Sequence, residues 1–143
     1  MKYELLQDYI AQRRQEIFEE GKALANSFYL ASEAALSEKS SSRRTKVGTR
    51  VRMIGNSLVC EWYWRRLANP IINGKRQTKI FSTYIRIGKN GRYSTGRFKS
   101  EPQWARIMIE QIEARYVVLR GISKELTNLE QSLKRLMDWD NPR

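Results

Sequence analysis

The sequence predicts a single α+β domain over residues 1–143, in which two long helices flank a four-stranded antiparallel sheet. Three observations predict this fold. Apolar residues recur with helical spacing in the first and last parts of the chain. Residues 47–99 instead alternate with the period of two that is typical of strands. Two short turn signals divide this middle segment into two hairpins.

The N-terminal helix is predicted over residues 2–38. Its apolar stripe consists of Tyr3, Ile10, Ile17, Gly21, Leu24, Phe28, Ala31 and Ala35. The stretch SEKSSSRRTK at residues 37–46 breaks this pattern with small polar residues, and we expect a flexible connection there.

The first hairpin is predicted to turn at Gly55-Asn56. Pairing across this turn sets one apolar face, with Met53 opposite Leu58, Val51 opposite Cys60 and Thr49 opposite Trp62, extended by Val47 and Trp64. The other face receives Arg50 opposite Glu61, Arg52 opposite Val59, then Tyr63 and Arg65. A slip of one residue would mix the two sets, so the pattern supports this register.

The second hairpin is predicted to turn at Asn90-Gly91, a strong hairpin signal. Its apolar face consists of Phe81, Thr83, Ile85, Ile87 and Phe98. Its polar face consists of Tyr84, Arg86, Tyr93, Thr95 and Arg97. The stretch ANPIINGKR at residues 68–76 would join the two hairpins into one sheet.

The C-terminal helix is predicted over residues 101–138, with Ser100 and Gln103 as a capping box. Gly121 is expected to bend or split it. Gly121 also interrupts the start of a heptad seam, which is formed by Leu119, Ile122, Leu126, Leu129, Leu133 and Leu136. The seam has two interpretations, a helical hairpin with residues 2–38 of the same chain or a coiled coil with a second copy. We favour the intramolecular hairpin and keep the homodimer as the alternative.

Positive charge is concentrated in the predicted sheet. The whole chain carries a net charge of +12. Residues 43–99 hold 15 of the 27 basic residues and one acid, Glu61, so this segment carries +14 and the remainder −2. Such a density of like charge favours a polyanionic partner, since nucleic acid phosphates would neutralise it and release counterions.

Protection against aggregation and attraction to a membrane would also use positive charge. Basic residues on exposed strands prevent edge-to-edge aggregation, but a single acid among four strands is unlike an ordinary mixed-sign surface. An anionic membrane would attract the same charge, but the basic face lacks the apolar wedge of a membrane-binding helix. We therefore expect no membrane partner.

The predicted nucleic-acid interface is made of the exposed basic and tyrosine side chains of this segment. Its residues are Arg43, Arg44, Lys46, Arg50, Arg52, Tyr63, Arg65, Lys75, Arg76, Tyr84, Arg86, Lys89, Arg92, Tyr93, Arg97 and Lys99. Strand arginines would read bases or grooves, loop cations would contact phosphates, and the tyrosines would pack on sugars or bases. Trp62, Trp64 and Cys60 share the apolar face, so we expect them in the core.

The chain has no histidine and one cysteine. This removes the commonest general base and transition-metal ligand, and it excludes Cys/His zinc sites and histidine-activated nucleophiles within one chain. No phosphate-binding loop spacing occurs. We therefore expect a protein that is not an enzyme and that needs no metal or cofactor. The single cysteine and the lack of a signal peptide or an apolar spanning segment lead us to expect a cytoplasmic location.

Three runs carry a resemblance to a known family: GNSLVCEWYWRRL, KRQTKIFSTYIRIGKNGRYSTGRF and FKSEPQWARIMIEQIEARYVVLR. Together they resemble the MobI family of bacterial conjugative-element proteins over residues 47–120. The matching features are the acidic-aromatic strand around Glu61–Trp64, the basic strand ending in IRIGK, the tyrosine after the turn, and the Phe-Lys that leads into a helix bearing a tryptophan.

The resemblance implies an accessory factor of the relaxosome. Such a protein would bind double-stranded DNA at an origin of transfer and help a separate relaxase to nick it. From the residues alone two alternatives remain: an RNA or single-strand binder that uses the tyrosines, and a coiled-coil interaction protein whose charge serves only solubility.

Overall fold

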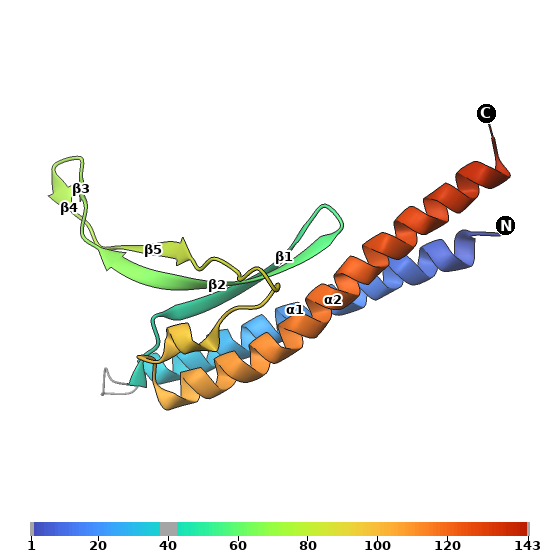
Figure 1. Cartoon of the computed structure of the whole chain (residues 1–143). Helices are drawn as coiled ribbons and strands as arrows, with labels where there is room; N and C mark the ends of the chain where they lie inside the picture. Colours follow the sequence, from blue (N-terminus) through green and yellow to red (C-terminus); the bar gives the residue numbers. More distant parts are fainter. Residues whose placement is uncertain (1, 38–42, 143) are drawn as a thin grey trace.

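Two long antiparallel helices lie under a curved antiparallel sheet (Figure 1). The computed structural model describes residues 2–37 and 43–142. Helix α1 spans Glu4–Leu36 and α2 spans Gln103–Asp140. The chain is thus α+β, with helices close to the predicted ranges. Part of the predicted flexible connection, residues 38–42, lies outside the described residues.

The two helices form a hairpin within one chain. Their apolar stripes meet, with Ile17 and Phe28 of α1 and Leu119 of α2 almost completely buried. Ion pairs cross between the helices along their length. Arg14 Nη1 lies 2.6 Å from Glu130 Oε2, and Arg115 pairs with Glu20. The predicted helical hairpin is confirmed.

The start of α2 differs from the prediction. Pro102 occupies the N-cap position, and no side chain caps the helix there, so the Ser100–Gln103 capping box is wrong. Glu101 is instead turned inward and buried, where its carboxylate accepts hydrogen bonds of 2.7 Å from Thr45 Oγ1 and from the Lys46 backbone N–H. Further along, Gly121 was expected to bend or split the helix. It lies inside α2, which continues unbroken from Gln103 to Asp140, so the helix is not split.

Three strands form the main sheet, in the order β1-β2-β5. Strand β1 spans Val47–Ile54, β2 spans Ser57–Ala68 and β5 spans Lys79–Tyr84. The first hairpin has the predicted register, with Thr49 paired with Trp62, Arg50 with Glu61 and Val51 with Cys60. The positive φ of Gly55, 60°, suits the tight turn between the strands.

The second predicted hairpin does not form. Strand β5 pairs with β2, and the segment after the turn contains the 3₁₀-helix η2, Thr95–Phe98, instead of a fourth strand. The turn itself is present, since the Gly88 N–H donates to the Arg92 carbonyl at 2.8 Å. The chain then leaves the sheet because the Tyr93 N–H donates to Glu113 of α2 at 3.1 Å, and Phe98 is buried in the core.

The stretch predicted as a connection forms a small hairpin of its own. Strands β3, Ile71–Ile72, and β4, Lys75–Arg76, make a separate two-stranded sheet. Its turn contains Asn73 and Gly74, with φ values of 52° and 76°. The Asn-Gly pair is a hairpin signal here too, but strands of two residues show no alternation that would predict them.

The core is built around Trp62, which is completely buried. Its ring meets Phe28 of α1 edge-on at 5.4 Å and Tyr116 of α2 at 5.6 Å. Cys60 is buried beside it, and Trp64 is partly buried against Phe98. The predicted core positions of Trp62, Trp64 and Cys60 are confirmed.

The thiol of Cys60 provides a test of this core. Burial raises the pKa of the Cys60 thiol to about 12. At pH 8 the thiolate fraction, and with it the rate of reaction with an aromatic disulfide reagent, should therefore be about 1,000-fold lower than for an ordinary cysteine. In denaturant the same thiol should react at the ordinary rate. Because the chain has one cysteine, rapid reaction of the native protein would contradict this packing.

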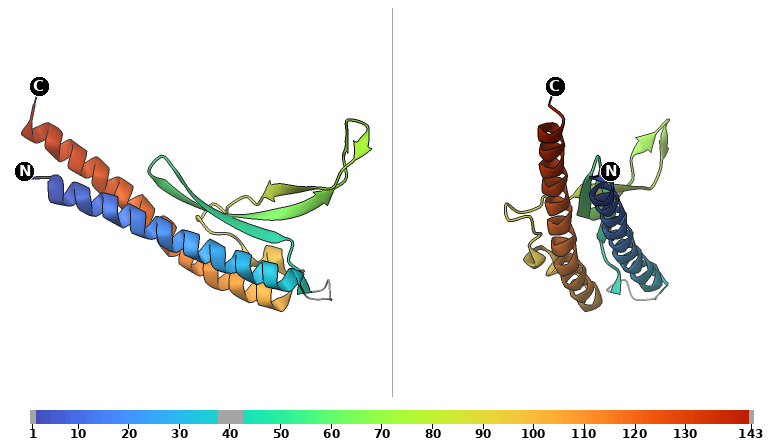
Figure 2. Two further views of the ribbon diagram at one scale, coloured as in Figure 1. Left: turned by 180° about the vertical axis from the view of Figure 1, so that it is seen from behind. Right: turned by 90° about the vertical axis from the view of Figure 1, so that its right-hand side faces the viewer.

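The sheet curves away from the helices. In Figure 1 and in the reverse view of Figure 2, the β1–β2 turn and the β3–β4 hairpin both rise from the helical layer, so the concave side of the sheet faces away from α1 and α2. All of β5 is exposed because this end of the sheet extends past the helices. Phe81 and Thr83 lie on the predicted face, since Thr83 pairs with Trp64 and Phe81 with Arg66, but no helix covers them there. Ile85 of the same predicted face is buried, whereas Ile87 is 39% exposed.

Candidate nucleic-acid interface

One face of the three-stranded sheet carries six of the predicted interface residues. The alternation that turns Cys60 and Trp62 toward the helices turns their neighbours to the opposite, concave side. We define the basic outer face as the side chains of Lys46, Arg50, Arg52, Tyr63, Arg65 and Tyr84. Lys46 belongs to it because the Arg65 N–H donates to the Lys46 carbonyl at 2.7 Å, which continues the β1–β2 register.

Glu61 lies between two arginines of this face. Arg50 Nη2 is 3.2 Å from Glu61 Oε2, and Arg52 Nη2 is 3.2 Å from Glu61 Oε1. This confirms the predicted pairing of Arg50 with Glu61 and adds Arg52. The carboxylate side chain is only 18% exposed, whereas the two guanidinium side chains are 43% and 44% exposed. The arginines are thus held side by side with part of each still open to solvent.

Two tyrosine rings pack against each other on the same face. The rings of Tyr63 on β2 and Tyr84 on β5 lie 5.4 Å apart, and the Arg50 guanidinium lies 4.8 Å from the centre of the Tyr84 ring. Tyr63 fits there because its cross-strand partner is glycine: a Cβ atom at Gly48 would lie 2.3 Å from Tyr63 Cζ. The face therefore combines cations with aromatic rings that are already packed.

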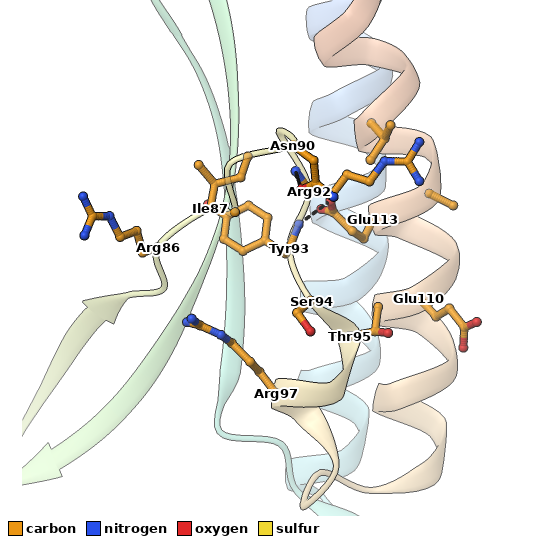
Figure 3. A pocket seen from close by; sticks show the side chains of 13 residues that line it. Arg86, Ile87, Asn90, Arg92, Tyr93, Ser94, Thr95, Arg97, Glu110 and Glu113 are labelled. Atoms are coloured by element: carbon orange, nitrogen blue, oxygen red, sulfur yellow. Dashed lines mark hydrogen bonds between the residues drawn. The ribbon is translucent and has the colours of Figure 1, made fainter.

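A second group of predicted residues lines a hollow beside the sheet, between the end of β5 and α2. This hollow has a volume of about 570 Å³ and includes Arg86, Arg92 and Arg97 among its lining residues. Figure 3 shows Arg86 and Arg97 on the strand side of the loop and Glu110 directed away on α2. Arg86 and Arg97 are exposed, but Arg86 lies in the loop after β5 and Arg97 lies in η2, not in two paired strands as predicted.

A buried carboxylate anchors the loop that forms this hollow. Glu113 of α2 accepts hydrogen bonds from the Trp62 indole N–H at 3.0 Å and from the Tyr93 backbone N–H at 3.1 Å, the latter drawn as a dashed line in Figure 3. It also forms a double ion pair with Arg120, whose Nη1 and Nη2 lie 2.8 and 2.9 Å from the two carboxylate oxygens. The Arg120 guanidinium donates further to the carbonyls of Cys60 and Gly91.

Tyr93 is the predicted interface residue that the structure removes from the surface. It is 7% exposed, and the Arg120 guanidinium lies 5.2 Å from the centre of its ring. Burial raises the pKa of the Tyr93 phenol. The alternation used to place it on the outer face fails because residues 93–98 are not a strand.

The Glu113–Arg120 pair was not predicted from the sequence. One signal was available: an acid at position 113 shares a helical face with the apolar residues Ile109, Ile112 and Tyr116. A charge at a core position requires a partner, and Arg120 is two helical turns further along. Sequence spacing could not show that a strand tryptophan and a loop amide share the same carboxylate.

The remaining predicted residues lie outside the three-stranded sheet and are all exposed. Lys75 and Arg76 form β4 at one end of the molecule, and Lys89 lies in the turn after β5. Lys99 follows η2. Arg43 and Arg44 precede β1, and the Arg44 guanidinium donates to the Leu36 carbonyl at 3.4 Å. These residues lie outside the basic outer face.

Comparison with known proteins identifies the family. A family model described as MobI protein matches residues 17–134. The chain belongs to the MobI family. The match contains the whole sheet, the ion pairs of Glu61 with Arg50 and Arg52, and the Glu113–Arg120 pair. It extends beyond residues 47–120, over which the resemblance was seen in the sequence. No curated protein and no solved structure matches the chain.

Membership of the MobI family places the chain among proteins of conjugative mobilisation. Within residues 2–37 and 43–142, neither helix is long and apolar enough to cross a membrane.

Proposed function

We propose that this MobI-family protein is a non-enzymatic accessory factor that binds double-stranded DNA at an origin of transfer and assists a relaxase there. The observation that carries the proposal is the basic outer face, which places four cations and a single neighbouring acid, Glu61, on the concave side of the sheet. The family supports a place in mobilisation, and the face supports DNA as the ligand.

Charge and shape favour the same ligand. The segment from residue 43 to residue 99 carries +14, and the helices that cover the other side of the sheet belong to a remainder of −2. Phosphates held against this face would release counterions, which supplies most of the non-specific affinity for DNA. A concave surface also follows the convex outline of a duplex more closely than a flat one.

The tyrosines favour a duplex over a single strand. A single-strand binder needs open aromatic faces on which bases stack. Tyr93 is buried, Tyr63 lies on Gly48 and against Tyr84, and one face of Tyr84 carries Arg50. None of the three is an unoccupied platform, although Tyr84 is 45% exposed.

A binding role without catalysis agrees with the chemistry of the face. Its one carboxylate, Glu61, is engaged by two arginines, and the chain has no histidine that could act as a base. We propose that the relaxase supplies the nicking chemistry.

The proposal is tested by competition between duplex and single-stranded DNA of the same origin sequence, measured at two salt concentrations. Duplex should compete more strongly, and its affinity should fall steeply as salt rises. Stronger competition by the single strand would favour the alternative of a single-strand binder. If neither duplex nor single-stranded DNA binds at any salt concentration, the result would favour the alternative of a coiled-coil interaction protein.

Replacing Arg86 and Arg97 together by alanine should weaken duplex binding. If both contact phosphates, the slope of log affinity against log salt should become shallower by about 1.8, at about 0.9 per contact. Lys22→Ala with Lys124→Ala removes the same charge from exposed positions on the helices and should leave the slope unchanged. An unchanged slope in the Arg86/Arg97 variant would show that the hollow beside the sheet takes no part in binding.

Replacing Glu61 by glutamine should have the opposite effect. The substitution removes the one acid from the face and releases Arg50 and Arg52 from their ion pairs, so more positive charge is available to phosphates. We expect tighter binding to any duplex and a steeper salt dependence, measured by fluorescence anisotropy. Glu33→Gln, an exposed acid of α1, is the matched control and should change neither value. Weaker binding by Glu61→Gln would contradict this interpretation.

A further inference from the structure

The ends of the two helices extend beyond the sheet. In Figures 1 and 2 both termini lie at the end of a helical hairpin that continues past the β1–β2 turn. Near the β1–β2 turn, the Leu58 N–H donates a hydrogen bond of 3.0 Å to Ser123 Oγ of α2. We define the helical arm as residues 2–14 and 124–140.

Half of the heptad seam is left open on this arm. Leu119, Leu126 and Leu133 are at most 6% exposed. The alternate seam residues Leu129 and Leu136 are 39% and 51% exposed. A two-helix hairpin buries one side of such a seam, and a four-helix bundle buries both.

Residues of α1 continue the open side. Tyr9 of α1 lines one hollow together with Ile122 and Leu129 of α2, with a volume of about 570 Å³. Leu5, one turn before Tyr9, is 83% exposed, and Tyr9 itself is 54% exposed. We define the apolar strip as Leu5 and Tyr9 of α1 together with Ile122, Leu129 and Leu136 of α2.

We propose that this strip is the dimer interface of the protein, and that a second copy packs its own arm against it about a two-fold axis. The net charge of the arm favours a second copy of the same chain as the partner. Residues 2–14 and 124–140 hold six basic and six acidic residues, a net charge of zero, in a chain of +12. The arm is therefore the part through which two strongly cationic chains can meet with least repulsion.

The border of the strip is also self-complementary. Arg13 and Glu125 line the same hollow from opposite helices. A two-fold axis presents the same patch to itself, so a border that carries both signs can pair each charge with its opposite in the other copy. The two basic outer faces would then be carried by one rigid bundle, in agreement with the proposed function but independent of it.

The test is the mass in solution without DNA, measured by sedimentation equilibrium over a range of protein concentrations. The full chain should have twice the 16.9 kDa of one chain. Leu129→Glu with Leu136→Glu should raise the dissociation constant at least about 100-fold, since each copy would bury two negative charges in the interface. Both positions are exposed in the single chain, so its fold, monitored by circular dichroism, should be kept.

Ile71→Glu is the matched control. Ile71 is 67% exposed on β3 at the other end of the molecule, and this variant should remain dimeric. A monomeric wild-type chain, or a dimer that survives both substitutions at Leu129 and Leu136, would overturn the proposal. A monomer that binds phosphatidylglycerol vesicles through the strip would overturn it as well and assign the strip to a membrane surface.

Discussion

Replacing Glu113 by alanine should lower the free energy of unfolding by about 3–5 kcal/mol, the cost of breaking a buried ion pair on one side. The side chains of Glu113 and Arg120 are 5% and 15% exposed. Without the carboxylate, Arg120 keeps its charge in the interior, and the N–H groups of Trp62 and Tyr93 lose their acceptor. Urea denaturation followed by tryptophan fluorescence measures the loss, because Trp62 lies at the centre of the core.

Glu110→Ala provides the control. Glu110 precedes Glu113 by three residues on α2 and is exposed, so its replacement should change the free energy of unfolding by less than about 0.5 kcal/mol. Arg120→Met in the Glu113→Ala background should recover part of the loss, since the uncompensated charge is then gone. If Glu113→Ala costs less than about 1 kcal/mol, the pair does not anchor the loop between β5 and α2.

The second large effect is expected on the basic outer face. Replacing Arg50, Arg52 and Arg65 together by glutamine should weaken duplex binding about 100-fold at moderate salt and lower the slope of log affinity against log salt by about 2.7. All three guanidinium groups lie on the side of the sheet away from the helices. Titration of a labelled duplex at several salt concentrations measures both values.

The control removes the same charge from the helices. Lys22→Gln, Lys124→Gln and Lys134→Gln replace exposed residues of α1 and α2, and this variant should bind duplex almost as the wild type does. Arg65 donates a hydrogen bond to the Thr45 carbonyl, so the unfolding of the arginine variant should be measured alongside. Equal loss of affinity in both triple variants would show that only net charge matters.

The parts of the fold that could be predicted from sequence are those governed by local periodicity. The Gly55-Asn56 turn fixes the β1–β2 register, because a two-residue turn allows one pairing and the pleat then assigns every side chain to a face. The same logic correctly located Trp62 in the core and the Arg50–Glu61 pair outside it.

The second half of the sheet could not be predicted because tertiary contacts overrode the local pattern. Residues 93–98 alternate like a strand, but Glu113, about 20 positions further along, takes the N–H of Tyr93 that a neighbouring strand would have used. As a result, Tyr93 is inside and Arg97 projects from η2 beside the sheet. The concentration of positive charge was predicted from composition, but the curvature that presents it on a concave side was not.

The central claim is that duplex DNA lies on the concave side of the sheet. The most direct measurement is the NMR spectrum of the arginine Nε–Hε groups while an origin duplex is added. We expect the signals of Arg50, Arg52 and Arg65 to shift, and those of Arg14, Arg115 and Arg120, which are held in ion pairs by the helices, to stay in place. Shifts confined to the helix arginines, with the sheet arginines unchanged, would contradict the account.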